Sequence, residues 1–191
     1  MEINTALLLI DVQRGFEQTN YWGGHRNNPE AEQKMAMLLA AWREGRLPVI
    51  HVKHDSVNPL SPLRPGQPGN QIRPEVFPRA DEVLFSKTVN SAFIGTSLEA
   101  YLRQQGIEKL VVCGMTTDHC ISSSVRMAAN LGFEVSLIED ATATFDRTFA
   151  GKHYQAEDIH NYHLLSLQDE FARIFTTSAA LKSLGEGQFQ H

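Results

Sequence analysis

An aspartate, a lysine and a cysteine each follow a separate apolar run of the sequence. Asp11 and Lys87 come directly after the first and third of these runs, and Cys120 lies a few residues beyond the fourth. A cysteine thiolate is a strong nucleophile, and a helix N-terminus or a nearby cation lowers a thiol pKa from about 8.5 to roughly 3.5–7.5. A carboxylate such as Asp11 can transfer the protons of such a reaction. The three residue types therefore suit nucleophilic catalysis by a Cys120 with a lowered pKa.

These side chains can meet only if the ends of the apolar runs converge. Strands are predicted from apolar runs at residues 6–10, 48–52, 82–86, 109–113, 134–138 and 171–175. Helices are predicted at residues 29–45, 96–105, 118–131 and 152–165. Strands that alternate with helices indicate an α/β fold with a parallel sheet, whose strands all end at one ligand-binding edge. We therefore expect the three reactive residues at this edge.

Each of the three residues also has a structural interpretation. A lone cysteine near a strand end is usually a small buried apolar residue. An aspartate at Asp11 could cap a turn, and Lys87 could be an exposed lysine, the commonest fate of that residue type. The backbone N–H groups of residues 116–120 could form an oxyanion hole beside Cys120. Spacing alone does not decide between these interpretations.

The composition limits the classes of protein to consider. The chain has 191 residues, of which 42% are hydrophobic and 20% charged, with a net charge of −5, which suits one domain over residues 1–184 and a short tail at 185–191. The sequence has no basic stripe, so we do not expect a nucleic-acid partner. No signal peptide or membrane-spanning stretch is visible, so we expect a cytoplasmic protein with no membrane partner. Cys113 and Cys120 do not suggest a disulfide.

The stretch from residue 55 to residue 80 contains six prolines and can hardly form a regular element. Long irregular segments in compact domains are usually functional. We expect this one to be a substrate lid or part of a subunit interface, and the sequence leaves the choice open. Arg64, Arg73 and Arg79 could bind a substrate carboxylate, although solvated surface arginine is the more frequent outcome.

Three segments resemble the motifs of the isochorismatase-like cysteine hydrolases, a superfamily that includes nicotinamidases, N-carbamoylsarcosine amidohydrolase and ureidoacrylate hydrolases. They are LLIDVQRGF at residues 8–16, FSK with SAF and GTSL within residues 85–98, and VCGMTTDHC at residues 112–120. The resemblance runs from about residue 5 to about residue 178. It implies a Rossmann-like three-layer α/β/α sandwich with a six-stranded parallel sheet in the order 3-2-1-4-5-6.

The resemblance also implies a catalytic triad of Asp11, Lys87 and Cys120. It implies a non-proline cis peptide bond between Met115 and Thr116, and an oxyanion hole made by the backbone N–H groups of Thr116 and Cys120. The implied reaction cleaves a C–N bond in a small amide, ureido or carbamoyl compound. Cys120 attacks the carbonyl, Asp11 protonates the leaving nitrogen, and water hydrolyses the resulting thioester.

Two other functions remain open within this resemblance. The family contains isochorismatase itself, which cleaves a vinyl ether, although relatives with that activity need not use a cysteine. A non-catalytic member could keep the fold as a ligand-binding module, but the complete triad argues against this. Relatives are commonly dimers or larger, so we expect a homodimer or a higher homo-oligomer that acts on a small molecule.

The histidines give no clear metal site. Metal-dependent nicotinamidases carry an Asp-x-His pattern after the second strand, which residues 51–56 lack. His51 and His54 are three apart on a strand and point to opposite faces. His160 and His163 share a helical face and could bind zinc, but paired exposed histidines are the commoner case. We therefore predict an enzyme without a metal or other cofactor.

Five residues near the motifs are candidates for substrate contacts. Phe16 and Trp22 follow the Asp11 motif and could form an aromatic wall, although ordinary loop packing is the alternative. Ser91 and Phe93 lie close to Lys87 in sequence and are predicted to contact the substrate. His119 precedes the nucleophile and is predicted to line the pocket, with packing behind the pocket as the alternative.

Overall fold

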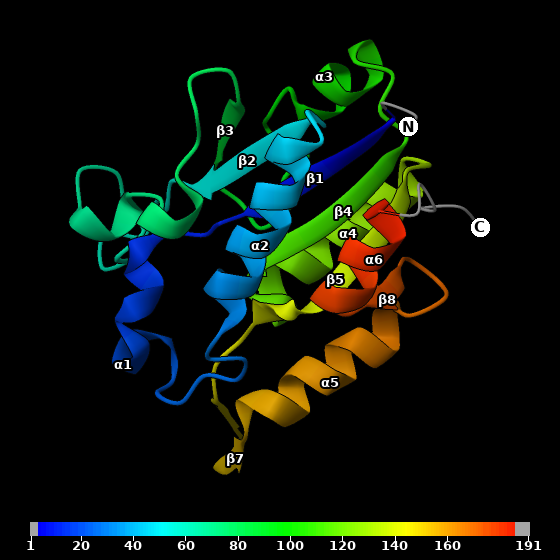
Figure 1. Ribbon diagram of the computed structural model, residues 1–191. Coiled ribbons are helices and arrows are strands. Elements are labelled where there is room, and N and C mark those ends of the chain that lie inside the picture. The colour runs from blue at the N-terminus through cyan, green and yellow to red at the C-terminus, as the bar shows by residue number, and fades with distance from the viewer. Residues whose placement is uncertain (1–3, 186–191) are drawn as a thin grey trace.

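The six apolar runs form one parallel sheet in the computed structural model, which describes residues 4–185 (Figure 1). The strand order is β3-β2-β1-β4-β5-β8, and every neighbouring pair is parallel. The strands are β1 Thr5–Ile10, β2 Val49–His54, β3 Val83–Lys87, β4 Lys109–Met115, β5 Glu134–Ala143 and β8 Arg173–Phe175. Because β8 is the sixth strand of this sheet, the predicted order 3-2-1-4-5-6 is confirmed.

Helices cover both faces of the sheet. The α-helices are α1 Thr19–Trp22, α2 Ala31–Glu44, α3 Leu98–Gln104, α4 Ser122–Asn130, α5 Ala156–Leu167 and α6 Thr177–Gly185. Shorter helical turns are η1 Arg14–Glu17, η2 Pro68–Asn70, η3 Pro74–Val76 and the π-helical turn η4 Thr117–Ile121. Among residues 4–185, no helix is long and apolar enough to cross a membrane.

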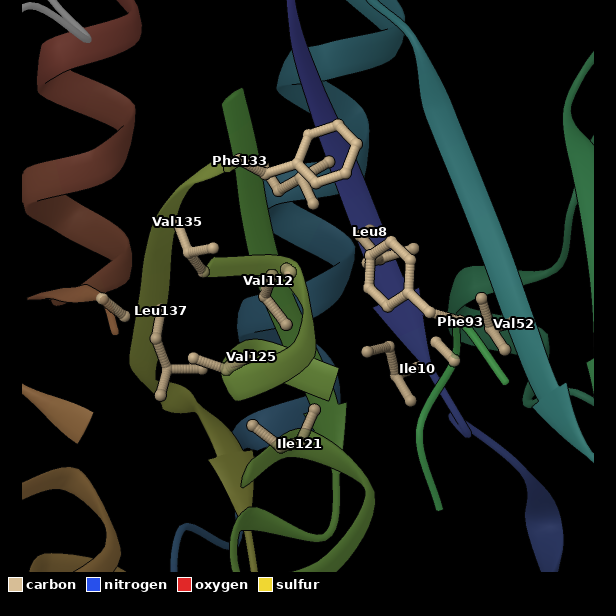
Figure 2. Packing of buried hydrophobic residues seen from close by; sticks show 14 of the residues in the cluster. Leu8, Ile10, Val52, Phe93, Val112, Ile121, Val125, Phe133, Val135 and Leu137 are labelled. Carbon is tan, nitrogen blue, oxygen red and sulfur yellow. The ribbon is translucent and has the colours of Figure 1, made fainter. Parts of the chain in front are cut away.

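Side chains of the central strands alternate between two hydrophobic cores. Leu7 and Leu9 pack on the face covered by α2 and α6, whereas Leu8 and Ile10 pack on the face covered by α3, α4 and α5. All six residues of β1 are buried, which explains why the run shows no polar alternation. Figure 2 shows the core on the face covered by α3, α4 and α5, where Leu8 and Ile10 lie near Phe93. Full burial of each such side chain contributes about 1.5–3 kcal/mol.

The C-terminal third differs from its prediction in several places. Residues 152–154 form strand β7 (Lys152–Tyr154), which pairs with β6 (Arg147–Phe149) in an antiparallel hairpin, so the helix predicted from residue 152 begins at Ala156. There the Asp146 side chain accepts a hydrogen bond of 2.8 Å from the Ala156 N–H and fixes the helix start. The sixth strand begins two residues later than predicted.

Helix α6 was not predicted from the sequence. It is short, and its buried Ala180 packs beside α2 and β5, so tertiary contacts stabilise it rather than a strong pattern of its own. The predicted tail at residues 185–191 lies outside the described residues except for Gly185, which ends α6.

The proline-rich stretch at residues 55–80 contains no strand or α-helix, as predicted, and two buried amides hold it against the sheet. The Asn70 side chain donates hydrogen bonds to the Leu63 carbonyl at 2.7 Å and to the His54 carbonyl at 3.1 Å. The Gln13 side chain donates to the Asn70 carbonyl and accepts from the His54 N–H. Buried amides with satisfied donors and acceptors fix a loop firmly. The stretch is therefore a structured wall at the carboxyl edge of the sheet.

Candidate active site

The structure brings Asp11, Lys87 and Cys120 together at the carboxyl edge of the sheet. Asp11 directly follows β1 in a left-handed conformation with φ of 55°, Lys87 ends β3, and Cys120 lies in η4 between β4 and α4. The Lys87 Nζ lies 2.6 Å from the Asp11 Oδ2 and 3.2 Å from the Cys120 Sγ. The side chains of Asp11 and Lys87 are 0% exposed, so this ion pair is shielded from water.

A fourth residue, His54, contacts the same ammonium and was missed as a site residue by the sequence reasoning. Its Nδ1 lies 3.0 Å from the Lys87 Nζ. The two residues end neighbouring parallel strands and face each other in the register of β2 and β3. The available signal was position, because a polar residue at the carboxyl end of a central strand points to the ligand-binding edge.

Burial and the surrounding charges set the protonation of the site. Burial lowers the pKa of Lys87, but the charges of Asp11 and Cys120 outweigh it, so the pKa of Lys87 is raised. Burial raises the pKa of the Cys120 thiol well above its usual range, the Asp11 charge adds to this, and the Lys87 charge opposes it. One ammonium compensates one buried negative charge, and Asp11 supplies that charge.

The expectation that Cys120 has a lowered thiol pKa is therefore wrong for the resting site. The sequence reasoning included the helix N-terminus and the lysine but not the burial of Cys120, which is 8% exposed, beside a carboxylate. The Asp11 Oδ1 is buried and has no hydrogen-bond partner, so it offers an acceptor for a proton. The arrangement places a thiol beside a carboxylate with an open acceptor, and Lys87 is bound to both.

The Lys87 ammonium occupies the one place in the described chain where potential metal ligands cluster. Within residues 4–185, Asp11, His54 and Cys120 are the only three His, Cys, Asp or Glu side chains whose ligand atoms all lie within 4.8 Å of one another. The Lys87 ammonium contacts all three of these residues. These side chains therefore fit the lysine that the chain itself supplies.

Two of the three remaining candidate metal-binding histidines have other partners. His51 points to the opposite face from His54, as predicted, and its Nε2 lies 2.9 Å from the Glu82 Oε2. His160 is buried rather than exposed, and its Nδ1 lies 2.8 Å from the Thr117 hydroxyl. His163 is half-buried and joins no metal-binding group among the described residues.

A small pocket of about 150 Å³ opens beside the nucleophile. Its walls are formed by Phe16, Tyr21, Trp22, His54, Ser56, Ser61, Leu63, Asn90, Thr116, His119 and Cys120. Asp11 and Lys87 do not line this pocket, because they lie buried behind Cys120 and His54. None of the lining residues carries a carboxylate, an ammonium or a guanidinium group, so the pocket has hydrogen-bonding groups but no fixed charge.

Three of the five predicted substrate-contact residues line this pocket. The Phe16 and Trp22 rings pack at a tilt of 32° with centroids 4.6 Å apart, and the Trp22 Nε1 donates to the Gly15 carbonyl, which fixes the wall. His119 lines the pocket as predicted. Ser91 and Phe93 do not, because the Ser91 hydroxyl accepts from the Phe93 N–H and the Phe93 ring packs in the core (Figure 2).

Residues from the proline-rich stretch complete the pocket. Ser56, Ser61 and Leu63 form part of its wall, and none of them was singled out from the sequence. The three arginines of that stretch, Arg64, Arg73 and Arg79, do not line the pocket, and Arg73 pairs with Glu17 and Glu75 instead. The idea that these arginines bind a substrate carboxylate here is therefore not supported by their positions.

The segment that carries Cys120 is held by contacts on both sides. Gly114 has a φ of 131°, and a β-carbon there would overlap the Ile10 carbonyl, so only glycine fits so close to β1. The peptide bond between Met115 and Thr116 is cis. Thr116, the second residue of this bond, lines the pocket. Asp118 accepts hydrogen bonds from Thr144 and Arg147, which anchors the turn.

The fold and the reactive edge described above agree with comparisons to known proteins. The Isochorismatase domain matches residues 5–179. YrdC, an isochorismatase family protein of Bacillus subtilis, is 44% identical over 178 residues, which are 93% of this chain and 94% of YrdC. The chain belongs to the isochorismatase family and is an isochorismatase-family hydrolase.

Two further relatives place the chain within this family. An isochorismatase-family hydrolase from Chromobacterium violaceum, known from a crystal structure, is 47% identical to this chain. The two structures align with a TM-score of 0.92, and the alignment covers 97% of this chain and 95% of the other. Streptothricin hydrolase from Streptomyces noursei is 34% identical over 144 residues, which are 74% of this chain and 50% of that enzyme.

Proposed function

We propose that this hydrolase cleaves a C–N bond in a small amide, ureido or carbamoyl compound, with Cys120 as the nucleophile and a thioester intermediate. One observation carries the proposal: the buried Lys87 ammonium binds both the Asp11 carboxylate and the Cys120 Sγ beside a pocket that Cys120 lines. The similarity to streptothricin hydrolase supports hydrolysis as the reaction class.

The first half of the reaction uses the proton shared by Cys120 and Asp11. As the Cys120 Sγ attacks the substrate carbonyl carbon, Asp11 takes the thiol proton at its unpartnered Oδ1. The Thr116 and Cys120 N–H groups bind the carbonyl oxygen as it becomes negative, and one such donor is typically worth about 3–4 kcal/mol. The tetrahedral intermediate collapses, the C–N bond breaks, and Asp11 gives the proton to the leaving nitrogen.

The second half returns the enzyme to its starting state. Water attacks the thioester carbonyl while Asp11 takes one proton from it. The C–S bond then breaks, the product acid leaves, and the Cys120 sulfur recovers a proton from Asp11. Lys87, whose pKa is raised, stays charged throughout, and it binds the Asp11 carboxylate whenever that group is ionised.

The pocket supports a small substrate that is uncharged near the reacting carbonyl. Its volume of about 150 Å³ lies below the roughly 300–1,000 Å³ of drug-sized ligand sites. A carboxylate would find no lysine or arginine among the lining residues. Flat groups can pack on the aromatic wall of Phe16 and Trp22, and the hydroxyl and amide groups of Ser56, Ser61 and Asn90 can hydrogen-bond to them.

A release assay with two cysteine variants tests the proposal. Ammonia or amine release is measured over a panel of amides, ureides and carbamoyl compounds for the wild type, Cys120→Ala and Cys113→Ala. Cys113 is the matched control, because it lies buried in β4 away from the pocket. We expect Cys120→Ala to abolish turnover and Cys113→Ala to retain it. Turnover by Cys120→Ala at the wild-type rate would reject Cys120 as the nucleophile.

Trapping the intermediate tests the chemical step itself. Rapid acid quenching of a reacting sample, followed by mass spectrometry, should show the acyl group of the substrate on the peptide that contains Cys120. An acyl group on any other residue, or steady turnover in Cys120→Ala without one, would point to a different nucleophile.

A further inference from the structure

The buried Lys87 ammonium needs more acceptors than Asp11 and Cys120 provide. A lysine ammonium has three N–H donors, and Lys87 is only 1% exposed, so water is largely excluded from it. A donor left unsatisfied on a buried charge is costly. The Asp11 Oδ2, the Cys120 Sγ and the His54 Nδ1 are three acceptors, at 2.6, 3.2 and 3.0 Å. His54 therefore completes the set of acceptors.

The backbone of His54 is fixed where it can perform this role. The Gln13 side chain accepts from the His54 N–H at 2.8 Å and donates to its carbonyl at 3.1 Å. The Asn70 side chain donates to the same carbonyl at 3.1 Å. Gln13 follows Asp11 by two residues, so the segment that carries the carboxylate also holds the histidine. The imidazole is thus positioned by the same buried network that fixes the pocket wall.

The contact with Lys87 sets the protonation state of the imidazole. Burial lowers the pKa of His54, and the Lys87 charge lowers it further, against the opposing charges of Asp11 and Asp55. A neutral ring that accepts a hydrogen bond at Nδ1 carries its proton at Nε2. His54 also lines the pocket, and no described residue accepts a hydrogen bond from its Nε2. The ring therefore has a donor available for a bound molecule.

We propose that His54 is a positioning residue that holds Lys87 against Cys120 and Asp11 through Nδ1, and that its Nε2–H binds an acceptor atom of the substrate. The second role rests on the proposed amide or ureide chemistry, whereas the first depends only on the geometry of the site. Without His54, the ammonium loses one of three acceptors and is free to turn away from the sulfur. A displacement of about 1 Å in a catalytic group can cost roughly 100-fold in rate.

Two substitutions separate the roles. His54→Asn places an amide oxygen near the position of Nδ1 and so keeps an acceptor for Lys87, but it removes the Nε2–H. His54→Leu has a comparable volume and removes both groups. His51→Asn is the matched control on the same strand, because His51 faces Glu82 and does not contact Lys87. Circular dichroism and melting curves of all variants identify those that are folded at the assay temperature.

Alkylation of Cys120 by iodoacetamide tests the positioning role without any substrate. Because the Lys87 charge opposes the rise of the thiol pKa, loss of its contact with Sγ should slow alkylation. We expect His54→Leu to shift the pH profile of Cys120 alkylation upward by about one unit, and His54→Asn to restore most of the shift. His51→Asn should leave the profile unchanged. A folded His54→Leu with the wild-type profile would overturn the positioning role.

Turnover kinetics test the substrate contact. His54→Asn should raise KM several-fold with kcat near that of the wild type, whereas His54→Leu should also lower kcat by roughly 100-fold. A His54→Asn enzyme with unchanged KM would overturn the Nε2–H contact. The outcomes are distinguishable from failure of the proposed function. Turnover by Cys120→Ala would reject Cys120 as the nucleophile, and a panel without any ammonia or amine release would reject the C–N chemistry, while the alkylation profiles still report on His54 and Lys87.

Discussion

Two charged clusters beside strands β2 and β3 differ in how completely their hydrogen-bonding groups are paired. The two Glu82 carboxylate oxygens accept hydrogen bonds from the Arg43 side chain and the Arg79 N–H. The His51 ring, as a donor, completes the set. Around Lys87, the Asp11 carboxylate keeps one buried oxygen without a partner. Burial and charge are common to both, but only the second cluster contains a thiol and an open acceptor.

The difference shows what separates a structural cluster from a reactive one. Burial raises the pKa of Glu82, but its hydrogen bonds to Arg43, Arg79 and His51 outweigh this and lower it to about 2, so the carboxylate has no tendency to take a proton near neutral pH. In the proposed mechanism Asp11 takes and returns a proton in each turnover, for which an oxygen without a hydrogen-bond partner is suited. An unfilled acceptor beside a nucleophile is therefore more informative than burial alone.

The largest expected effect comes from removing the Lys87 ammonium. Lys87→Met removes the ammonium that binds both Asp11 and Cys120, and we expect turnover to fall by roughly 10⁴-fold, as when one member of a triad is removed. The measurement is kcat/KM for a substrate found in the release assay. If Lys87→Met kept more than a tenth of the wild-type value, the reactive cluster would not act as a unit.

Loss of the structural carboxylate should affect stability rather than turnover. Glu82→Gln leaves the Arg43 guanidinium without its charged partner in a mostly buried position, and breaking a buried pair costs roughly 3 kcal/mol. Urea unfolding measures this change. Below the midpoint of unfolding, kcat/KM should remain near that of the wild type. A marked loss of turnover in folded Glu82→Gln would show that the cluster around Glu82 is also needed for turnover.

The same carboxylate predicts a pH window for stability. The folded-state pKa of Glu82 is about 2, lower than the ordinary value of 4.5, so its contribution is fully present above about pH 4.5 and is lost as pH falls toward 2. The wild type should therefore lose more stability than Glu82→Gln between these pH values. Equal losses in the two proteins would show that other groups control acid unfolding.

The smallest expected effect concerns the aromatic wall of the pocket. Trp22→Leu removes the stacking surface beside Phe16, which is worth about 1 kcal/mol. KM should rise about fivefold while kcat changes little, because Trp22 does not touch Lys87, Asp11 or Cys120. Steady-state kinetics give both constants. An unchanged KM would place the substrate elsewhere in the pocket.

The central sheet and its reactive edge could be predicted because each depends on local sequence. The run Ala6-Leu7-Leu8-Leu9-Ile10 is buried on both faces, which makes it a recognisable central strand. The positions of Asp11, Lys87 and Cys120 at or beyond such runs then follow from the parallel arrangement. The motif resemblance supplied the strand order, which hydrophobic patterning alone does not give.

The parts that could not be predicted depend on contacts between distant segments. The start of α5 depends on Asp146, the stability of α6 on its packing near α2, and the pocket wall on hydrogen bonds from Gln13 and Asn70 across the edge of the sheet. The thiol pKa of Cys120 depends on its burial beside Asp11. Phe93 was assigned to the pocket because it lies near Lys87 in sequence, whereas its side chain points into the core.

The most direct test of the shared proton compares the wild type with Asp11→Asn. Removing the carboxylate charge leaves the Lys87 charge beside the sulfur unopposed by Asp11, so the thiol pKa should fall. We predict that Asp11→Asn alkylates with iodoacetamide faster than the wild type at pH 7, yet no longer releases ammonia or amine from any substrate. Slower alkylation, or turnover near the wild-type rate in Asp11→Asn, would contradict the assignment of Asp11 as the group that accepts and returns the proton of Cys120.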